Sequence, residues 1–252
     1  MFRGTDVGAH GALMNEIYRR QRHIYDLTRR GYLLGRDLAL QELMAHGGPL
    51  NLLELGCGTG RNLVRAARMN PRSSCFGVDA SSEMLLTARR NIARARLDGR
   101  IRIVQGDARR FVAQEAFARM RFDRVLVSYM LSMVPGWEEV LERAIAQLAP
   151  GGMIAVVDFG SRSGYPAVFD RLFRAWLARF HVTPRDDLDA VFEHRARKLG
   201  LAAIRFRPIC RDYAVLLLAS RPGCALLHTH APIAPGASAS AVVRGDTATA
   251  AR

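Results

Sequence analysis

The stretch Leu50-Asn51-Leu52-Leu53-Glu54-Leu55-Gly56-Cys57-Gly58-Thr59-Gly60 decides the fold of this chain. It is a short apolar run that carries an acidic residue near its end and then three glycines at alternate positions. This pattern predicts a buried strand that turns sharply into a helix. Glycine suits such a turn because a backbone without Cβ lets a bulky ligand lie against it. The helix that follows, Asn62–Ala67, would present free N–H groups at its start.

Two ligands are compatible with such a turn. A dinucleotide fingerprint, G-x-G-x-x-G, needs its third glycine where this chain has Arg61. The spacing here is instead G-x-G-x-G after Glu54, which resembles motif I of the class I S-adenosyl-L-methionine (SAM) methyltransferases, E/D-x-G-x-G-x-G. Taken alone, a glycine turn indicates no more than a tight connection between a strand and a helix. The interpretation therefore depends on the sequence that follows.

The downstream sequence carries further features of that family in the expected order. Cys75–Asp79 reads as a second strand, and its terminal carboxylate lies about 20 residues past the glycine turn, the spacing of a group that binds ribose hydroxyls. After the predicted strand Ile101–Gln105, Gly106-Asp107-Ala108 resembles the G-D-A that contacts adenine in this family. The turn Leu148–Gly152 resembles the family's L-x-P-G-G. The resemblance covers roughly residues 50–160.

The resemblance implies a SAM site made of the glycine turn, the acidic strand ends and the residues beside them. This predicted cofactor set is Glu54, Gly56, Cys57, Gly58, Gly60, Asp79, Ala80, Met84, Asp107, Ala108 and Ser128. For Met84 a place in the core is an equally good interpretation. Ser81 is expected to cap the helix that contains Met84.

Strands and helices alternate along the chain, which predicts an α/β fold with a doubly wound, seven-stranded, mostly parallel sheet of the Rossmann-like methyltransferase type. The last strand, Asp212–Ser220, is expected to be antiparallel. We expect an N-terminal helical cap over residues 1–48, the methyltransferase domain over 49–220, and a disordered tail over 221–252, where Ala, Gly, Pro, Ser and Thr dominate.

The net charge of +14 over 252 residues favours an anionic partner. The arginines are spread along the whole chain, which weakens the case for nucleic acid, and the surface of a membrane fits the charge as well as RNA does. We predict a membrane surface and no nucleic acid as partner. The four cysteines show no metal-binding spacing, and no apolar run approaches the roughly 20 residues of a membrane span. We therefore predict no metal site and a cytoplasmic protein that is peripherally associated with the inner face of the membrane.

A closer resemblance is to the bacterial betaine-lipid methyltransferases, and it runs from about Leu13 to Ala219. The stretches that carry it are Tyr18–Asp26, Leu33–Asp37, Leu126–Met133, Val157–Gly160 and Arg179–Arg185. In that family the enzyme methylates the amine of diacylglyceryl-homoserine three times to give a betaine lipid. The resemblance implies this lipid substrate and a functional partnership with the enzyme that makes the homoserine lipid.

Such an acceptor ends as a quaternary ammonium, which aromatic faces hold at roughly 0.5–2 kcal/mol per good contact. Tyr18, Tyr25 and Tyr32 recur every seven residues in a predicted helix, and Tyr129 follows the fourth strand. The predicted catalytic residues are Tyr25, Tyr32, Tyr129, Asp158 and His181, the last two as a proton relay, and the predicted substrate residues are Tyr18, Arg19, Arg22 and Arg179. A structural role is equally compatible for His181, and an ordinary amphipathic cap for the tyrosines.

Other possibilities stay open at this point. A phospholipid amine N-methyltransferase or a quinone C-methyltransferase would share the SAM site, and a non-catalytic or RNA-binding protein would keep only the fold. The helix Ala167–Phe180 carries arginines beside apolar and aromatic residues, so it fits either an anionic membrane interface or packing against the sheet. For most of its apolar side chains we expect packing against the sheet.

Overall fold

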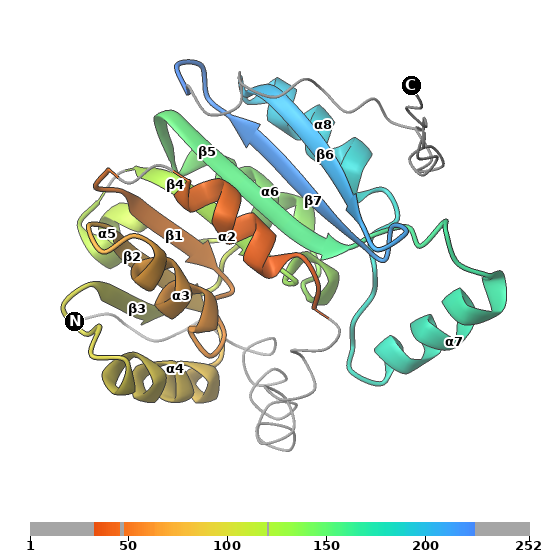
Figure 1. Cartoon of the computed structure of the whole chain (residues 1–252), viewed down its shortest axis with the longest axis horizontal. Coiled ribbons are helices and arrows are strands. Elements are labelled where there is room, and N and C mark those ends of the chain that lie inside the picture. The colour runs from red at the N-terminus through yellow and green to blue at the C-terminus, as the bar shows by residue number, and fades with distance from the viewer. Residues whose placement is uncertain (1–32, 46–47, 120, 225–252) are drawn as a thin grey trace, which may run out of the picture.

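The computed structural model of the protein describes residues 33–45, 48–119 and 121–224. These residues form a seven-stranded sheet with helices on both of its faces, which confirms the predicted doubly wound fold (Figure 1). The strands are β1 Asn51–Leu55, β2 Ser74–Asp79, β3 Ile101–Gln105, β4 Phe122–Ser128, β5 Leu148–Phe159, β6 Ala202–Ile209 and β7 Ala214–Ser220.

The strand order is β3-β2-β1-β4-β5-β7-β6. The first five strands in this order are parallel, and β7 runs antiparallel to both of its neighbours, as expected. The order reverses between β1 and β4, and ligands of open α/β sheets bind at the carboxyl ends of the strands at such a point. The glycine turn after β1 therefore stands at the place where this topology puts a ligand.

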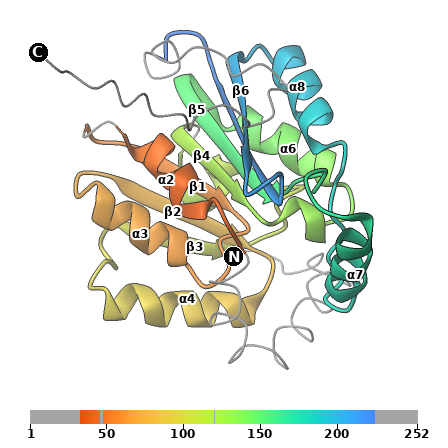
Figure 2. The same cartoon turned by 45° about the vertical axis from the view of Figure 1, so that its right-hand side comes forward.

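The helices divide between the two faces of the sheet (Figure 1, Figure 2). One core cluster joins the sheet to α2, α3 and α4, and the other joins it to α5, α6 and α8. The helices are α2 Arg36–Met44, α3 Arg61–Met69, α4 Ser82–Arg94, α5 Ala113–Phe117, α6 Trp137–Ala146, α7 Ala167–Ala178 and α8 Leu188–Lys198, with a short 3-10 helix η1 at Leu131–Met133. No described helix has the length and apolar character that crossing a membrane requires.

The predicted strands and the predicted cap are present, because apolar runs and capping side chains favour their structure through contacts within a few residues. Ser81 caps α4, and its hydroxyl accepts from the Met84 N–H at 3.3 Å. The strand β5 starts earlier than its apolar run: Leu148 pairs with Phe122, and the register shifts before Met153 pairs with Arg124. The predicted turn at Leu148–Gly152 is therefore an irregularity inside the strand.

Helix α7 differs from the expectation that most of its apolar side chains pack against the sheet. Leu177 is its one fully buried residue, whereas Val168 and Leu172 are 58% and 66% exposed. In both views this helix lies to the side of the sheet (Figure 1, Figure 2). The packing prediction is therefore wrong for the outer side of α7.

The ends of the chain bear on two further predictions. Several predicted site residues lie outside the described part of the chain, so their roles stay predictions: Tyr18, Arg19, Arg22, Tyr25 and Tyr32. The tail from residue 225 onward also lies outside it.

The packed chain continues past the predicted domain end at Ser220. The Arg221 N–H donates to the Gly152 carbonyl at 2.9 Å, and Cys224 is buried.

Candidate functional site

The glycine turn between β1 and α3 has a backbone that favours glycine at three positions. Gly56, Gly58 and Gly60 have φ angles of 72°, 52° and 75°. The N–H groups of Gly56 and Cys57 both donate to the Val78 carbonyl, at 2.8 and 3.0 Å, so β2 fixes the turn. A Cβ on Gly56 would lie 2.7 Å from the Met130 sulfur, whereas one on Gly58 would meet nothing within 4 Å. The turn is thus packed on one side and open on the other.

The open side faces a cavity of about 760 Å³ at the carboxyl ends of β1 to β4. All of the predicted cofactor set lines this cavity except Gly60, which caps α3 and packs on Ala88. Met84 is 4% exposed and also lines the cavity, so it is a core side chain with one edge at the wall. The structure therefore brings together the residues that the sequence pattern grouped.

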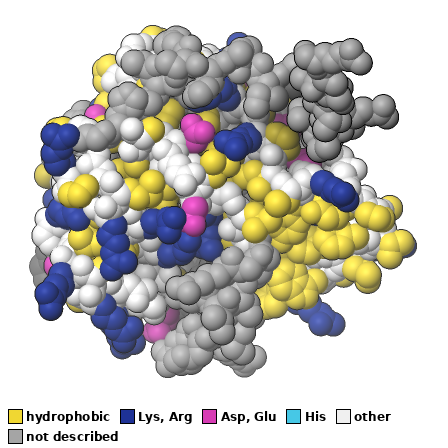
Figure 3. Space-filling model, viewed as in Figure 1, with side chains coloured by type: hydrophobic (Ala, Val, Ile, Leu, Met, Phe, Trp, Pro, Cys, Tyr) yellow, Lys and Arg dark blue, Asp and Glu magenta, His cyan; other side chains and the backbone are white. Residues whose placement is uncertain are grey.

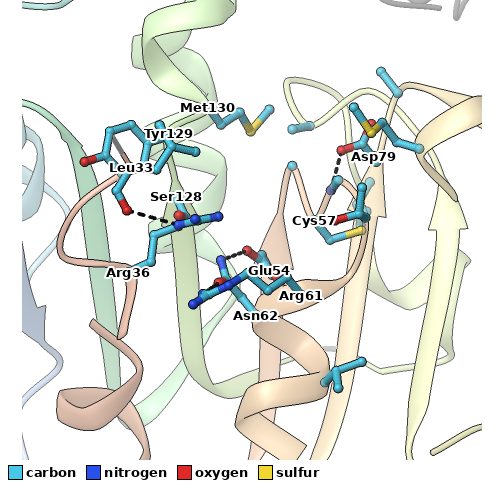
Figure 4. A pocket seen from close by; sticks show the side chains of 18 of the residues that line it. Leu33, Arg36, Glu54, Cys57, Arg61, Asn62, Asp79, Ser128, Tyr129 and Met130 are labelled. Carbon is cyan, nitrogen blue, oxygen red and sulfur yellow. Dashed lines mark hydrogen bonds between the residues drawn. The ribbon is translucent and has the colours of Figure 1, made fainter. Parts of the chain in front are cut away.

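Asp79 is held firmly at the end of β2. One carboxylate oxygen accepts from the Gly58 N–H at 2.8 Å (Figure 4). The other accepts from the Ser81 N–H at 2.9 Å. The carboxylate thus links the glycine turn to the start of α4 and keeps a fixed place in the cavity wall. A carboxylate held in a fixed place is suited to accept hydrogen bonds from a diol ligand.

Asp107 lines the cavity beyond β3 and has a partner that the sequence did not indicate. The Arg109 guanidinium lies 2.5 Å from one of its oxygens and 3.0 Å from the other, and the Arg109 N–H donates to it at 2.9 Å. This ion pair orients the Asp107 carboxylate. An adenine amine that donates to Asp107 would therefore share the carboxylate with the Arg109 guanidinium.

Glu54 lies in the cavity wall and is 1% exposed, and only one of its two carboxylate oxygens has a hydrogen-bond partner among the described residues. Its Oε1 accepts from the Asn62 amide at 2.7 Å, while Oε2 has no hydrogen-bond partner among the described residues. Burial raises the pKa of Glu54 to about 8, although Asn62 and the nearby Arg36 act to lower it. A second enclosed polar atom, the Ser128 hydroxyl at the end of β4, likewise lacks a partner in the described part of the chain.

These two unsatisfied atoms test whether the site fits a polar ligand. A buried polar atom without a partner costs free energy unless a ligand or water completes it. The ammonium group of an amino-acid ligand would satisfy Glu54 Oε2 and stabilise the ionised carboxylate. The residues present therefore fit the methionine end of SAM as well as its ribose.

Arg36 is a site residue that the sequence did not single out. It opens α2 and points into the cavity between Tyr129 and Glu54, with its Nε donating to the Leu33 carbonyl at 3.2 Å (Figure 4). Its charge acts on the pKa values of both Glu54 and Tyr129. It lies in the stretch Leu33–Asp37 that carries the betaine-lipid resemblance, but the sequence pattern assigned it no role, because its position in the cavity depends on where α2 begins. Other cavity-lining residues outside the predicted site set include Leu33, Arg61, Asn62, Met130, Met133 and Val134. Of these, Leu33, Met130 and Met133 lie in stretches that carry the resemblance to the betaine-lipid enzymes.

Tyr129 lines the cavity, where the sequence placed it. It follows β4 with a φ of 51° and is 5% exposed. Its hydroxyl donates to the Leu34 carbonyl at 2.7 Å, and its ring contacts Phe159 edge to face at 4.9 Å. The hydroxyl and one edge of the ring are therefore occupied by the protein.

The two residues of the predicted proton relay, Asp158 and His181, lie in different surroundings. Asp158 is buried and accepts from the N–H groups of Phe159 and Ser132, at 2.8 and 3.2 Å; burial raises its pKa to about 6. His181 lies exposed in the turn after α7, next to the exposed substrate candidate Arg179. None of these three residues lines the cavity formed by the described part of the chain. His181 is exposed whereas Asp158 is buried, so the relay between them stays a prediction.

Comparisons with known proteins agree with the geometry. Residues 52–152 match a family model described as a methyltransferase domain. The demethylmenaquinone methyltransferase of Listeria monocytogenes serotype 4a (strain HCC23) is 29% identical over 127 residues, which make up 49% of this chain and 52% of that protein. The demethylmenaquinone methyltransferase of Desulfitobacterium hafniense (strain Y51) is 29% identical over 180 residues, 68% of this chain and 69% of that protein.

Among solved structures, phosphoethanolamine N-methyltransferase 2 of Haemonchus contortus, in complex with phosphomonomethylethanolamine and S-adenosylhomocysteine, has a similar fold. The TM-score is 0.61 at 17% identity, over 74% of this chain and 52% of that chain. This likeness shows the fold. The chain spans about half the length of the Listeria relative that it matches.

Glu54 generates a prediction on stability against pH. Its pKa in the folded protein, about 8, lies above the ordinary 4.5, so ionising it penalises the folded state. The ligand-free protein should therefore lose stability as the pH rises from 4.5 to about 8, by up to about 1.4 kcal/mol per pH unit. Glu54→Gln keeps an acceptor for Asn62 and cannot ionise, so it should lose less. Urea unfolding at several pH values measures the difference.

The control for this experiment is Glu115→Gln, which removes a carboxylate at an exposed position. It should follow the unsubstituted protein at every pH. Parallel curves for Glu54→Gln and the unsubstituted protein would show that the buried carboxylate does not titrate in this window.

Proposed function

We propose that this protein is a SAM-dependent methyltransferase that holds SAM in the cavity between the glycine turn and β4. The observation that carries the proposal is the wall built by Glu54, the turn Gly56–Gly60 and Asp79, in a domain that matches the methyltransferase family model. When bound, SAM supplies a methyl group on a sulfonium, which is open to attack by a nucleophile. Asp79 would hold its ribose, and Asp107, Ala108 and Met84 would surround its adenine.

The amino-acid end of SAM would lie between Glu54 and Arg36. These two side chains offer opposite charges to an ammonium and a carboxylate, and both lie at the end of the cavity away from Asp79 (Figure 4). Binding there would complete the unsatisfied Glu54 Oε2. The protein's contribution to methyl transfer is then chiefly to position donor and acceptor in line and to keep water out.

For the acceptor we propose the amine of diacylglyceryl-homoserine, methylated to the trimethyl betaine lipid. Two of the stretches that resemble the betaine-lipid enzymes, Leu33–Asp37 and Leu126–Met133, meet in the cavity wall although they lie far apart in the sequence. The hydrogen bond from Tyr129 to Leu34 joins them. This convergence supports a common role for both stretches in holding the acceptor.

Tyr129 is the described aromatic residue best placed to face a methylated amine. As the amine becomes quaternary it loses its N–H donors, so hydrogen bonds no longer hold it, whereas a ring face still does. Asp158 lies close enough to Tyr129 to affect its pKa, so we expect it to position this ring rather than to contact the acceptor. The same proposal includes a functional partner that supplies the homoserine lipid.

A quinone C-methyltransferase is the second candidate, and the names of the two relatives above favour it. A quinol acceptor would need a base to take its phenolic proton and would have no use for a cation-binding ring. The two candidates share the SAM site and differ at Tyr129. Lipid analysis of cells that express this chain, with and without a supply of diacylglyceryl-homoserine, separates them directly.

For the cofactor, we expect Asp79→Ala to weaken SAM binding by at least about tenfold, since it removes a charge-assisted pair of hydrogen bonds to the ligand. Isothermal titration calorimetry measures the affinity. Because Asp79 also accepts from Gly58 and Ser81, a thermal melt must show that the variant is folded. The exposed Asp98 provides the control, Asp98→Ala, with unchanged affinity. Equal SAM affinity of a folded Asp79→Ala variant would overturn the assignment.

For the acceptor, we expect Tyr129→Leu to keep SAM affinity and to lose about tenfold or more in turnover, with mono- and dimethylated lipid accumulating. Tyr129→Phe keeps the ring face and loses only the bond to Leu34, so it should be impaired less. Mass spectrometry of products from detergent-dispersed diacylglyceryl-homoserine follows each methylation step. Turnover of demethylmenaquinone but not of the homoserine lipid would reject the acceptor and leave the SAM-dependent activity standing.

A further inference from the structure

Helix α7 exposes an unusual amount of apolar surface on one side. Val168, Phe169, Leu172 and Trp176 are 58%, 38%, 66% and 37% exposed, and we call these four the α7 patch. Their spacing puts them on neighbouring positions of one helix side. Single exposed apolar residues are normal, but a contiguous group of this kind marks an interaction surface.

The patch is built on stacked rings. Tyr165 stacks on Phe169 at 4.7 Å, Phe169 on Phe173 at 5.8 Å, and Phe173 on Trp176 at 5.7 Å. Phe173 continues inward to Phe159 at 5.7 Å, and Phe159 contacts Tyr129 in the cavity wall at 4.9 Å. A chain of aromatic contacts therefore ties the helix that carries the patch to the wall of the proposed active site.

A network of ion pairs fixes which side of α7 faces outward. The fully buried Arg162 side chain contacts Asp170 at 2.5 Å and Asp186 at 3.4 Å. Arg174 contacts the same two carboxylates, each at 2.7 Å. These pairs join α7 to the segment before it and to the segment after it. With its polar side held in this way, α7 keeps the patch directed away from the sheet.

The same face of the molecule is rich in positive charge. Arg171 and Arg179 are exposed on and just after α7, and Arg61, Arg65 and Arg68 of α3 line the cavity. Figure 3 shows the apolar side chains over α7 beside Lys and Arg side chains over the helices to the left. The chain as a whole carries a net charge of +14. Apolar side chains flanked by cations are the combination that binds at the surface of an anionic membrane.

We infer that this face docks on an anionic lipid bilayer, with α7 lying in the interface and its patch inserted among the acyl chains. The charge favours the bilayer as occupant, because anionic headgroups can pair with the exposed arginines while the acyl chains receive the apolar patch. Docking in this orientation would bring the arginine-lined part of the cavity close to the headgroups. The inference concerns binding alone and does not depend on the proposed methyl transfer.

Val168 and Val112 allow a matched pair of variants. Both valines are exposed, at 58% and 40%, and Val112 lies outside α7, just before α5. Each Val→Asp change places a carboxylate at or near the N-terminus of a helix, where negative charge is tolerated, so both proteins should fold. Both changes lower the net charge by the same amount. The two variants therefore differ in whether the α7 patch is disrupted, because Val168 belongs to it and Val112 does not.

The experiment is co-sedimentation with vesicles of phosphatidylcholine alone and of phosphatidylcholine with phosphatidylglycerol. The unsubstituted protein should bind the anionic vesicles, and less so as salt is added. Val168→Asp should bind about tenfold more weakly or worse, while Val112→Asp binds like the unsubstituted protein. All three should bind SAM equally in calorimetry, so failure of docking is distinguishable from failure of the proposed function.

Trp176 gives a second measurement on the same samples. The other tryptophan, Trp137, is 5% exposed in the core, so a blue shift of the emission on adding anionic vesicles reports Trp176. The shift should vanish in Trp176→Phe. Absence of binding at low salt, equal binding of the two Val→Asp variants, or a dimer in solution that Val168→Asp dissociates would each overturn the inference; the last would identify the patch as an interface between copies.

Discussion

Two hydrogen bonds to one carbonyl oxygen set the geometry of the site. The N–H groups of Gly56 and Cys57 both donate to the carbonyl of Val78, which forces the chain to turn where β1 ends and ties that turn to β2. Because β1 lies between β2 and β4 in the sheet, the turn opens at the point where the strand order reverses. The position of Asp79, the start of α3 and the mouth of the cavity all follow from this constraint.

Two carboxyl groups near the site are buried, where ionisation costs free energy. Glu54 and Asp158 are both buried carboxyl groups with raised pKa values, but their environments differ. Both Asp158 oxygens accept backbone hydrogen bonds, so this group is structurally satisfied. Glu54 keeps one oxygen without a partner in a cavity wall. A fold retains such a cost most readily where a ligand removes it, which is why Glu54, rather than Asp158, marks the site.

Helix α7 connects the chemistry of the cavity with the surface of the molecule. Its ion pairs with Arg162 and the contact of Phe173 with Phe159 attach it to β5 and the segments around it, while its outer side remains apolar. A lipid acceptor needs both a polar site for the reacting group and a way for its acyl chains to stay in the bilayer. The arrangement of α7 beside Tyr129 is compatible with both needs in one orientation.

The sequence by itself determined the strands, the glycine turn and the Ser81 cap, because apolar runs, glycine spacing and caps act over a few residues; the grouping of the predicted cofactor residues came from the family resemblance. Only the tertiary structure decided that Arg36 enters the cavity, that His181 stays outside it and that α7 turns its apolar side outward. These outcomes depend on contacts between distant segments, such as the hydrogen bond from Tyr129 to Leu34 and the ion pair between Arg162 and Asp186. A local pattern shows which side chains a helix presents, but the direction in which it presents them is set by contacts that the pattern does not contain.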